Sequence, residues 1–199
     1  MIIGLTGGIA SGKTLVSDYL KSLGYPVVDA DLLSREVMAQ PETLADVRAA
    51  FGDGVFCADG SLDRAALARR VFSDAKARQR LDAITHPAIA QLAQARFAEY
   101  GGAPLVFFVV PLLYESGMDA LCDRVWLVHA DAALREKRLM ARDAIDADYA
   151  RQKIAAQMSE EERLARGPRV LTNDGDSAHL YEQIQTFLKK SVKNLEKKC

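Results

Sequence analysis

The strongest chemical signal in the sequence is a glycine-rich segment near the N-terminus that ends in a lysine and a threonine. Gly7-Gly8-Ile9-Ala10-Ser11-Gly12-Lys13-Thr14 matches the P-loop pattern G-x-x-x-x-G-K-[ST] at every fixed position. Glycines let the backbone approach a phosphate closely, and the loop N–H groups surround it at the start of a helix. In such a loop Lys13 contacts the β- and γ-phosphates, and the Thr14 hydroxyl ligates Mg²⁺. The segment therefore predicts binding of a nucleoside triphosphate.

Phosphoryl transfer also needs carboxylates, and Asp29 and Asp31 follow the second apolar run. This is the carboxyl edge where α/β proteins bind ligands. Two aspartates spaced i, i+2 on an extended segment point the same way. One of them can hold Mg²⁺, directly or through water, while the other accepts a proton from an attacking hydroxyl. We expect Asp31 to be the base; the alternative is that one aspartate only caps a helix beginning near Leu32.

The third apolar run supplies no carboxylate of its own. It ends at Pro111, where an ordinary Walker B strand has an aspartate, which leaves the carboxylate role to the pair after the second run. Glu115 lies nearby, and we expect it to be a surface or helix-capping residue.

Three arginines, Arg135, Arg138 and Arg142, are spaced three and four apart and share one helical face. Like charges so placed repel unless an anion lies between them. The spacing predicts a mobile lid that brings guanidinium groups onto the transferring phosphoryl group, with Arg138 the first choice and Arg142 the second. The alternative is a structural role, with Asp131 and Asp146 neutralising part of the stripe.

Two further features are weaker. His86-Pro87 interrupts a long helical pattern, where a lone histidine is more often packed or capping than functional, and Pro87 is expected to impose a break or a first-turn position. Asn173-Asp174-Gly175 is first of all a turn by its local chemistry. Asn173 can also offer its amide to a nucleotide base.

The elements that must position these residues alternate in the manner of a parallel α/β sheet. Leu32 to Tyr100 shows helical patterns and no convincing strand, which suggests a helical substrate-binding insertion. We therefore expect a P-loop NTPase fold, a five-stranded parallel sheet flanked by helices, with that insertion and a helical lid. The five expected strands are Ile2–Thr6, Pro26–Asp29, Leu105–Val110, Arg124–Val128 and Arg169–Leu171.

Composition narrows the class of protein. At 199 residues, 49% of them hydrophobic, the chain can bury a core in one domain, and its net charge of −1 disfavours nucleic-acid binding. No apolar run approaches the roughly 20 residues that span a bilayer, and Met1 leads directly into a strand rather than a signal peptide. The three cysteines are widely spaced and resemble the reduced cysteines of cytosolic proteins. We expect a cytoplasmic protein with no membrane or nucleic-acid partner.

Taken in order, these motifs resemble the dephospho-coenzyme A kinase family across nearly the whole chain. The P-loop is shared by many families, whereas the acidic pair, the His-Pro and the Pro-Leu-Leu strand end are more specific. The resemblance rests on Gly4–Lys13, Asp29 with Asp31, His86-Pro87, Val109–Glu115, Arg138 with Arg142, and Asn173 with Gly175.

The resemblance implies ATP- and Mg²⁺-dependent phosphorylation of the ribose 3′-hydroxyl of dephospho-coenzyme A, the last step of coenzyme A synthesis. It implies a nucleotide-binding core over 1–31, 101–131 and 167–199, a coenzyme-A-binding insertion over 32–100 and a lid over 132–166. The partners would be ATP and dephospho-coenzyme A, and the chain a monomer or small homo-oligomer.

The same resemblance assigns residues to roles. Asp31 is the expected base, acting with Lys13 and Arg138, and Mg²⁺ falls to Thr14 with Asp29 or Asp31. The acceptor positions are Thr6, Asp31, His86, Leu112 and Leu113. The ATP positions are Gly8, Ile9, Ala10, Ser11, Gly12, Lys13, Thr14, Leu15, Val16, Arg142 and Asn173, with Asn173 near the adenine.

The sequence departs from the family pattern in two places. Leu15 follows Thr14 where a second hydroxyl residue is common, so one contact to the α-phosphate is in doubt, although the Leu15 backbone N–H can serve. Arg166-Gly167-Pro168-Arg169 replaces the usual Ala-Asp approach to the last strand, which leaves the local chain path open.

Other functions fit less well. The nearest rival is another P-loop small-molecule kinase acting on nucleosides or nucleotides, because the helical insertion decides the acceptor. A GTPase-like switch would need N-K-x-D and D-x-x-G elements, which the sequence lacks in usable positions. A third possibility is ATP binding without catalysis, against which the position of Asp31 argues.

Overall fold

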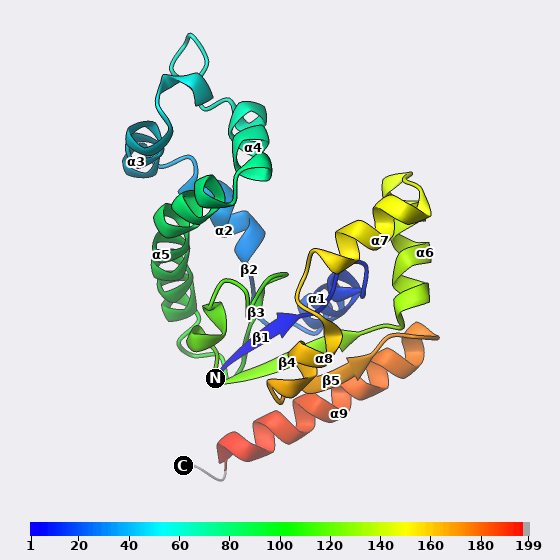
Figure 1. The fold of residues 1–199 in the computed structure, drawn as a ribbon. Coiled ribbons are helices and arrows are strands. Elements are labelled where there is room, and N and C mark those ends of the chain that lie inside the picture. The colour runs from blue at the N-terminus through cyan, green and yellow to red at the C-terminus, as the bar shows by residue number, and fades with distance from the viewer. Residues whose placement is uncertain (197–199) are drawn as a thin grey trace. The chain divides into compact units, whose positions relative to one another are not determined.

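The computed structural model describes residues 1–196, so Cys199 and the end of the segment 167–199 lie outside it. Five parallel strands form one sheet in the order β2-β3-β1-β4-β5, flanked by helices, which confirms the predicted fold class (Figure 1). Each strand begins and ends within one residue of its predicted bounds. The strands are β1 Ile2–Thr6, β2 Val27–Asp29, β3 Val106–Val109, β4 Arg124–His129 and β5 Arg169–Thr172.

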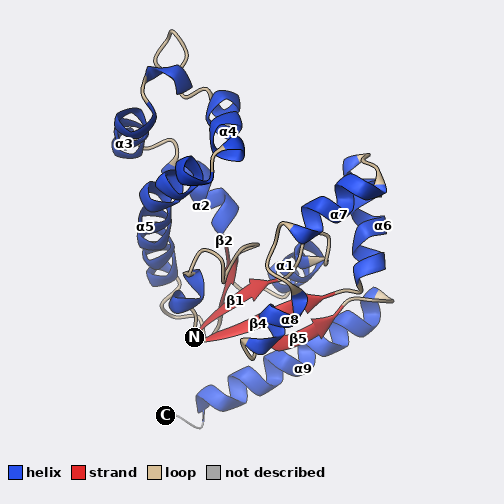
Figure 2. Ribbon diagram, in the orientation of Figure 1, coloured by secondary structure: helices blue, strands red, loops and turns tan. Residues whose placement is uncertain are grey.

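The main core lies between one face of the sheet and two helices, α1 Lys13–Ser22 and α9 Ser177–Glu196. Alternate strand residues face this side, as the two-residue period of a strand requires. Figure 2 shows α9 running beside β5, and the rings of Tyr19 and Tyr181 stack at 3.9 Å where α1 meets α9. The buried residues of this core are Ile3, Leu5, Val16, Leu20, Leu105, Phe107, Val109, Trp126, Val128, Leu171, Leu180, Ile184 and Leu188.

The opposite face of the sheet is packed tightly at Gly4. A Cβ there would lie 2.8 Å from Cys122 Sγ and 3.0 Å from Leu113 Cδ2, so a side chain at this position would displace both. Cys122 ends the short 3₁₀ helix η2, Met118–Leu121, and Leu113 belongs to the segment that follows β3. The glycine therefore lets the chain after β3 close over β1 without a gap.

The chain divides into two compact units, Met1–Asp29 with the chain from Phe97 onward, and Ala30–Arg96. The second unit is built from helices around its own apolar cluster, and its strand-like pairing is an isolated bridge between Phe56 and Leu62. Its elements are α2 Ala30–Val37, α3 Pro41–Phe51, the 3₁₀ helix η1 Asp53–Val55, α4 Arg64–Ser73 and most of α5 Ala75–Glu99. The predicted boundaries of the insertion and its role in acceptor binding stay predictions.

The predicted break at Pro87 is wrong, because α5 runs through this residue without interruption. A proline inside a helix costs about 3 kcal/mol through its missing N–H and its clash with the preceding turn. Buried side chains on either side, Thr85 and Ile89, anchor the helix, and the Thr85 hydroxyl donates 3.0 Å to the Leu81 carbonyl. Packing on both sides of the proline therefore offsets the local loss.

The segment 132–166 forms three helices within the first unit: α6 Ala132–Asp143, α7 Ala147–Ala155 and α8 Glu160–Ala165. Asp131 and Asp146 cap α6 and α7, accepting from the Ala133 and Tyr149 N–H groups at 2.9 Å and 2.8 Å. Among the described residues, Arg135 and Arg142 form ion pairs with Glu160 and Asp143, not with these two aspartates, and whether the aspartates neutralise part of the stripe stays a prediction. A mobile-lid role for the segment stays a prediction.

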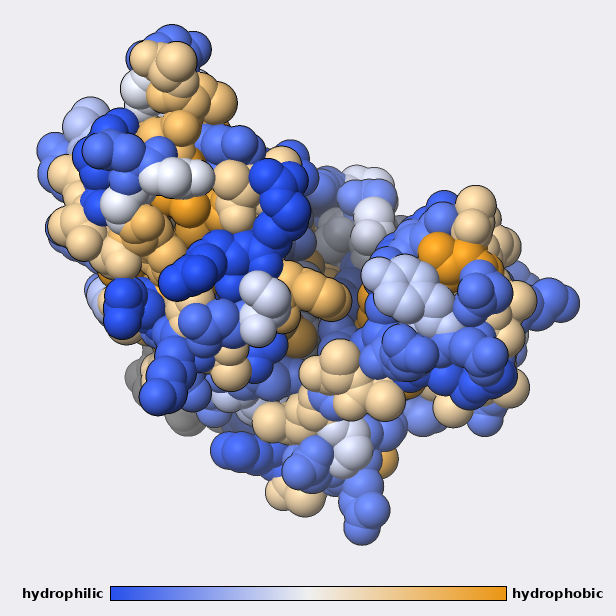
Figure 3. Space-filling view, turned by 45° about the horizontal axis from the view of Figure 1, so that its top comes forward, coloured by the Kyte–Doolittle hydropathy of each residue, from blue (hydrophilic) through white to orange (hydrophobic). Residues whose placement is uncertain are grey.

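Hydrophilic residues cover most of the face drawn in Figure 3, with smaller hydrophobic patches between them. Some large apolar side chains are exposed, most of all Phe72 at 88%. In the described part of the chain, no helix combines the length and the apolar character that crossing a lipid bilayer requires.

Candidate functional site

The P-loop connects the end of β1 to the start of α1, the context that its sequence pattern requires. Gly12 precedes α1 with φ of 100°, and a Cβ there would lie 2.1 Å from Asn173 Nδ2, so only glycine fits. In the part of the chain that the structure describes, no side chain caps this end of α1, so its first N–H groups face the loop, where an anion is favoured. Lys13 Nζ donates to the carbonyls of Gly7 at 2.8 Å and Gly8 at 3.1 Å.

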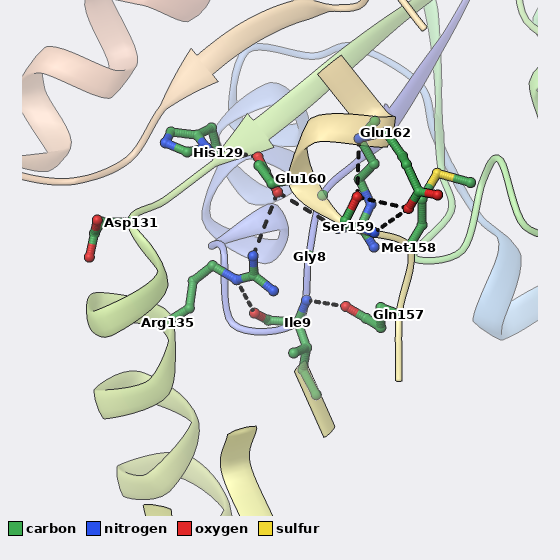
Figure 4. A network of polar contacts seen from close by, with 12 residues as sticks. Gly8, Ile9, His129, Asp131, Arg135, Gln157, Met158, Ser159, Glu160 and Glu162 are labelled. Atoms are coloured by element: carbon green, nitrogen blue, oxygen red, sulfur yellow. Dashed lines mark hydrogen bonds and ion pairs between the residues drawn. The ribbon is translucent and has the colours of Figure 1, made fainter. Parts of the chain in front are cut away.

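Three side chains from distant parts of the chain hold the loop from outside. Figure 4 shows Gln157 and Arg135 on either side of Ile9: the Ile9 N–H donates to Gln157 Oε1 at 2.7 Å, and Arg135 Nε donates to the Ile9 carbonyl at 3.0 Å. Asn173, which is buried, donates from Nδ2 to the Ser11 carbonyl at 2.8 Å. The loop conformation therefore depends on α6, on the chain before α8 and on the residue after β5.

Glu160, the first residue of α8, is the negative charge that pairs with Arg135 beside the P-loop (Figure 4). One carboxylate oxygen lies 2.7 Å from His129 Nδ1, and the other lies 3.6 Å from Arg135 NH1 and 3.7 Å from Arg163 NH1. Burial lowers the pKa of Arg135, and Glu160 opposes that shift. Because a buried guanidinium needs a partner, Glu160 is what allows Arg135 to lie against the P-loop.

Glu115 is exposed, as expected for a surface residue, but its carboxylate is not free of contacts. Its Oε1 accepts from the Met158 N–H at 3.1 Å and pairs with NH2 of the fully buried Arg163 at 3.3 Å. The carboxylate therefore ties the segment after β3 to the start of α8, a contact that satisfies part of a buried charge.

The arginines of α6 differ strongly in environment. Arg142 is more than half exposed and pairs with Asp143, with Nε and Oδ1 2.7 Å apart. Arg138 is half-buried, and its NH1 is a buried atom with no hydrogen-bond partner among the described residues. Arg135 is 4% exposed and is the one of the three seen to bond to the loop. One helical face thus carries a bound, an unsatisfied and an exposed guanidinium.

The two aspartates do not share one extended segment as predicted. Asp29 is the last residue of β2, whereas Asp31 lies in the first turn of α2, because the helix begins at Ala30. Asp29 pairs in register with Val109, which puts it at the carboxyl edge of the sheet. Among the described residues, no group of three or more His, Cys, Asp or Glu side chains is arranged to hold a metal ion. Any cation held here would therefore depend on hydroxyl and phosphate oxygens as well.

The predicted acceptor residues occupy varied environments. The buried Thr6 hydroxyl donates to the Pro111 carbonyl at 3.3 Å, Leu112 is 44% exposed, and Leu113 is fully buried against Gly4. His86 lies on α5 in the other unit, 3.7 Å from Asp82 Oδ1. Leu113 therefore lies in the core, whereas Leu112 presents its side chain at the surface.

Two remaining ATP positions follow the loop. Val16 is fully buried in the core of the first unit, and Leu15 is 36% exposed. The Ser17 hydroxyl lies one turn on and donates to the Thr14 carbonyl at 3.0 Å. The side-chain hydroxyl absent at position 15 is therefore not replaced by Ser17, whose hydroxyl already bonds to the helix.

Sequence reasoning missed Arg135, Gln157 and Glu160 as parts of the site. Arg135 stood out only as one of a stripe, and nothing local distinguishes the member that turns inward. Gln157 carries no pattern of its own. Glu160 had a signal, because Ser159-Glu160-Glu161-Glu162 fits a capping box, which the structure contains with both of its hydrogen bonds. That signal fixes where α8 begins, although not what Glu160 contacts.

Comparison with known proteins agrees with this geometry. Residues 1–179 match the family model described as dephospho-CoA kinase. A dephospho-CoA kinase from Geobacter sulfurreducens is 46% identical over 187 residues, covering 92% of this chain and 95% of its own. A second, from Moorella thermoacetica, is 48% identical over 179 residues, covering 88% and 84%.

The fold has solved counterparts. A Thermus thermophilus protein superposes with a TM-score of 0.82 at 37% identity, covering 96% of this chain and 97% of its own. A dephospho-CoA kinase from Campylobacter jejuni shares the fold at a TM-score of 0.73 and 23% identity, covering 97% and 98%. The family model matches most of this chain, and the P-loop that the motif predicts is held in place by α6. This chain therefore belongs to the dephospho-CoA kinase family.

Proposed function

We propose that this chain transfers the γ-phosphoryl group of ATP to the 3′-hydroxyl of dephospho-coenzyme A, giving coenzyme A and ADP. Membership of the dephospho-CoA kinase family implies this reaction, and it is a phosphotransferase reaction of coenzyme A biosynthesis. The single observation that carries the proposal is the family match over residues 1–179, which includes the intact P-loop and the segment of α6 that holds it.

The P-loop is the proposed site of the ATP phosphates. Its glycines and the uncapped start of α1 support this role, because backbone N–H groups at a helix N-terminus favour a phosphate. Lys13, which bonds to the Gly7 and Gly8 carbonyls, lies where its ammonium can move onto the β- and γ-oxygens. Leu15 is proposed to contact the α-phosphate through its backbone N–H, because its side chain has no hydroxyl.

Mg²⁺ is the proposed divalent ion. The Thr14 hydroxyl at the start of α1, with the Asp29 carboxylate at the end of β2, is the kind of oxygen donor that this hard cation prefers. Bound with ATP, the ion supplies neutralisation of the charge on the phosphate oxygens. Asp31 is the alternative carboxylate, directly or through water.

Asp31 is the proposed general base. It lies in the first turn of α2, directly after the strand whose end carries Asp29. A carboxylate in this position accepts the proton of the 3′-hydroxyl as the oxygen attacks the γ-phosphorus, while the bond to the ADP oxygen breaks. Charge that develops on the transferred group is proposed to be stabilised by Arg138, whose unsatisfied guanidinium nitrogen supports that role, with Arg142 adding to the nucleotide site.

The acceptor is proposed to bind through Thr6, His86, Leu112 and Leu113, and Asn173 to lie near the adenine. We further propose the cytoplasm as the compartment, a monomer or small homo-oligomer as the assembly, and small molecules as the partners. These assignments rest on the family resemblance of the sequence.

The test compares steady-state turnover with dephospho-coenzyme A against a panel of nucleosides in Mg-ATP. Turnover confined to dephospho-coenzyme A is expected, and no measurable turnover with it would overturn the proposed function. Asp31→Asn should lower kcat by about 10²- to 10⁴-fold, the range of general-base catalysis, with ATP binding retained. The exposed Asp46→Asn on α3 is the matched control. Near-normal kcat in Asp31→Asn would show that another group is the base.

A further inference from the structure

Ala10, in the middle of the P-loop, has a backbone conformation that its side chain disfavours. Its φ is +61°, and among the described residues Ala144, just after α6, is the only other non-glycine with a positive φ. The left-handed region brings Cβ of an L-residue close to the following carbonyl, so glycine is preferred there. Such strain persists only where surrounding contacts hold the backbone in place. The loop must therefore be held at this point by something outside it.

Arg135 makes the contact that can do this. The carbonyl of Ile9 and the N–H of Ala10 belong to one planar peptide unit, so fixing the Ile9 carbonyl fixes one side of the φ rotation of Ala10. Arg135 Nε donates to that carbonyl at 3.0 Å. On the other side of Ile9, its N–H donates to Gln157 Oε1 at 2.7 Å, so both peptide units flanking the residue are held (Figure 4).

The guanidinium that makes this contact is itself fixed. It is 4% exposed, it pairs with Glu160, and it lies so close to Gly8 that a Cβ there would be 2.4 Å from Arg135 Cζ. Its fork of donors is divided, with Nε on the loop and NH1 toward the carboxylate. A lysine would bring a single nitrogen and could not occupy both positions with the same geometry.

We propose that Arg135 is a positioning residue of the nucleotide site, which holds the Ile9–Ala10 peptide so that the strained Ala10 keeps the P-loop in its phosphate-binding shape. The inference rests on the proposed function, because the loop is taken to bind ATP. This role was not predicted from the spacing of the three arginines, which assigned the contacts with the transferred group to Arg138 and Arg142. Arg135 does not touch the transferred group; it acts on the phosphates through the backbone of the loop.

The test is a double-mutant cycle on Arg135 and Ala10, with the dissociation constants of ATP and ADP measured by calorimetry without acceptor. Arg135→Ala should weaken both nucleotides by about tenfold or more, the scale of a lost charge-assisted hydrogen bond. Ala10→Gly alone supplies the reference affinity for the second background, because glycine adopts this φ without strain. In the Ala10→Gly background, Arg135→Ala should weaken ATP by about threefold or less, since the strain that Arg135 holds is gone.

Controls separate this role from a general loss of folding. Arg151→Ala removes an exposed arginine of the same segment, paired with Glu136 and Asp148, and should leave nucleotide binding unchanged. Thermal unfolding of each variant confirms a folded state. If Arg135→Ala does not fold, Arg135→Lys, which keeps the charge opposite Glu160, replaces it in both backgrounds. The expected loss of nucleotide affinity is then smaller, and it should again be smaller in the Ala10→Gly background than in the parent.

The inference is overturned if the Arg135 substitution leaves nucleotide affinity unchanged, or if it weakens ATP by the same factor in the parent and in the Ala10→Gly variant. Either result leaves the proposed function intact. That function fails only if the parent protein shows no turnover with dephospho-coenzyme A, which the binding measurements do not involve.

Discussion

Asn173 offers a sharp test of how the nucleotide site is held together. The family resemblance places this residue near the adenine, whereas the structure shows its buried amide donating 2.8 Å to the Ser11 carbonyl of the P-loop. Asn173→Ala removes the donor and leaves that carbonyl buried without its partner. If the amide serves the loop, every ligand that binds through phosphates should lose affinity, whatever its base.

The magnitude follows from the contact. Leaving a buried acceptor unsatisfied costs about 1–3 kcal/mol, which corresponds to an affinity loss of at most about 5- to 150-fold if the whole effect falls on the binding-competent loop. Part of the loss should appear as a lower free energy of unfolding, because the contact between the end of β5 and the loop exists without ligand. The ATP dissociation constant and the unfolding free energy should therefore both change.

The assay is calorimetric titration of ATP, GTP and inorganic tripolyphosphate into the parent, Asn173→Ala and the exposed neighbour Thr172→Ala as control. We expect Asn173→Ala to weaken all three ligands by a similar factor and Thr172→Ala to change none of them. A loss confined to ATP, with tripolyphosphate binding intact, would refute the loop-holding role and assign the amide to the base.

Further predictions concern packing, cysteine reactivity and acid stability. Gly8→Ala should weaken ATP binding by about tenfold in calorimetry, because the new Cβ would lie 2.4 Å from Arg135 Cζ and displace that guanidinium; binding within about twofold of the parent would contradict this packing. Burial raises the pKa of Cys122 to about 12, so at pH 8 a thiol reagent should label the exposed Cys57 quickly and Cys122 only on unfolding, as peptide mass spectrometry would show. Hydrogen bonds from Arg142 and Lys153 hold the pKa of Asp143 at about 2, below its ordinary 3.8. The stability that Asp143 adds is present above about pH 4 and lost as pH falls toward 2, so Asp143→Asn should lower Tm at pH 6 and converge with the parent near pH 2. An equal gap at both pH values would contradict that linkage.

The sheet was predictable because its strands are short apolar runs buried on both faces, a pattern that needs no knowledge of their neighbours. The P-loop was predictable for a related reason, since the backbone conformation of the loop itself requires its glycines. Pro87 shows the limit of such local rules. A proline normally ends a helix, yet α5 continues through Pro87, and residues on both sides of it are buried. Packing of that kind is not written in the residues next to the proline.

The residues of the site show the same contrast between what local sequence patterns predict and what packing decides. The sequence placed Lys13 in the loop and three arginines on one face of a helix, but it treated those arginines as equals. In the folded chain Arg135 is buried against Gly8 and Ile9, while Arg142 remains exposed beside Asp143. The difference arises from which turn of α6 meets the loop and the carboxylate of Glu160.

By itself the sequence of this protein determined the local conformations: five strands, a phosphate-binding turn, and a family pattern that spans the chain. Only the tertiary structure decided which side chains hold that turn. Gln157, Arg135 and Asn173 lie 148, 126 and 162 residues from the loop positions they bond. Propensity and motif spacing act over a few residues, whereas these contacts exist only once the sheet has brought its strand ends and α6 together.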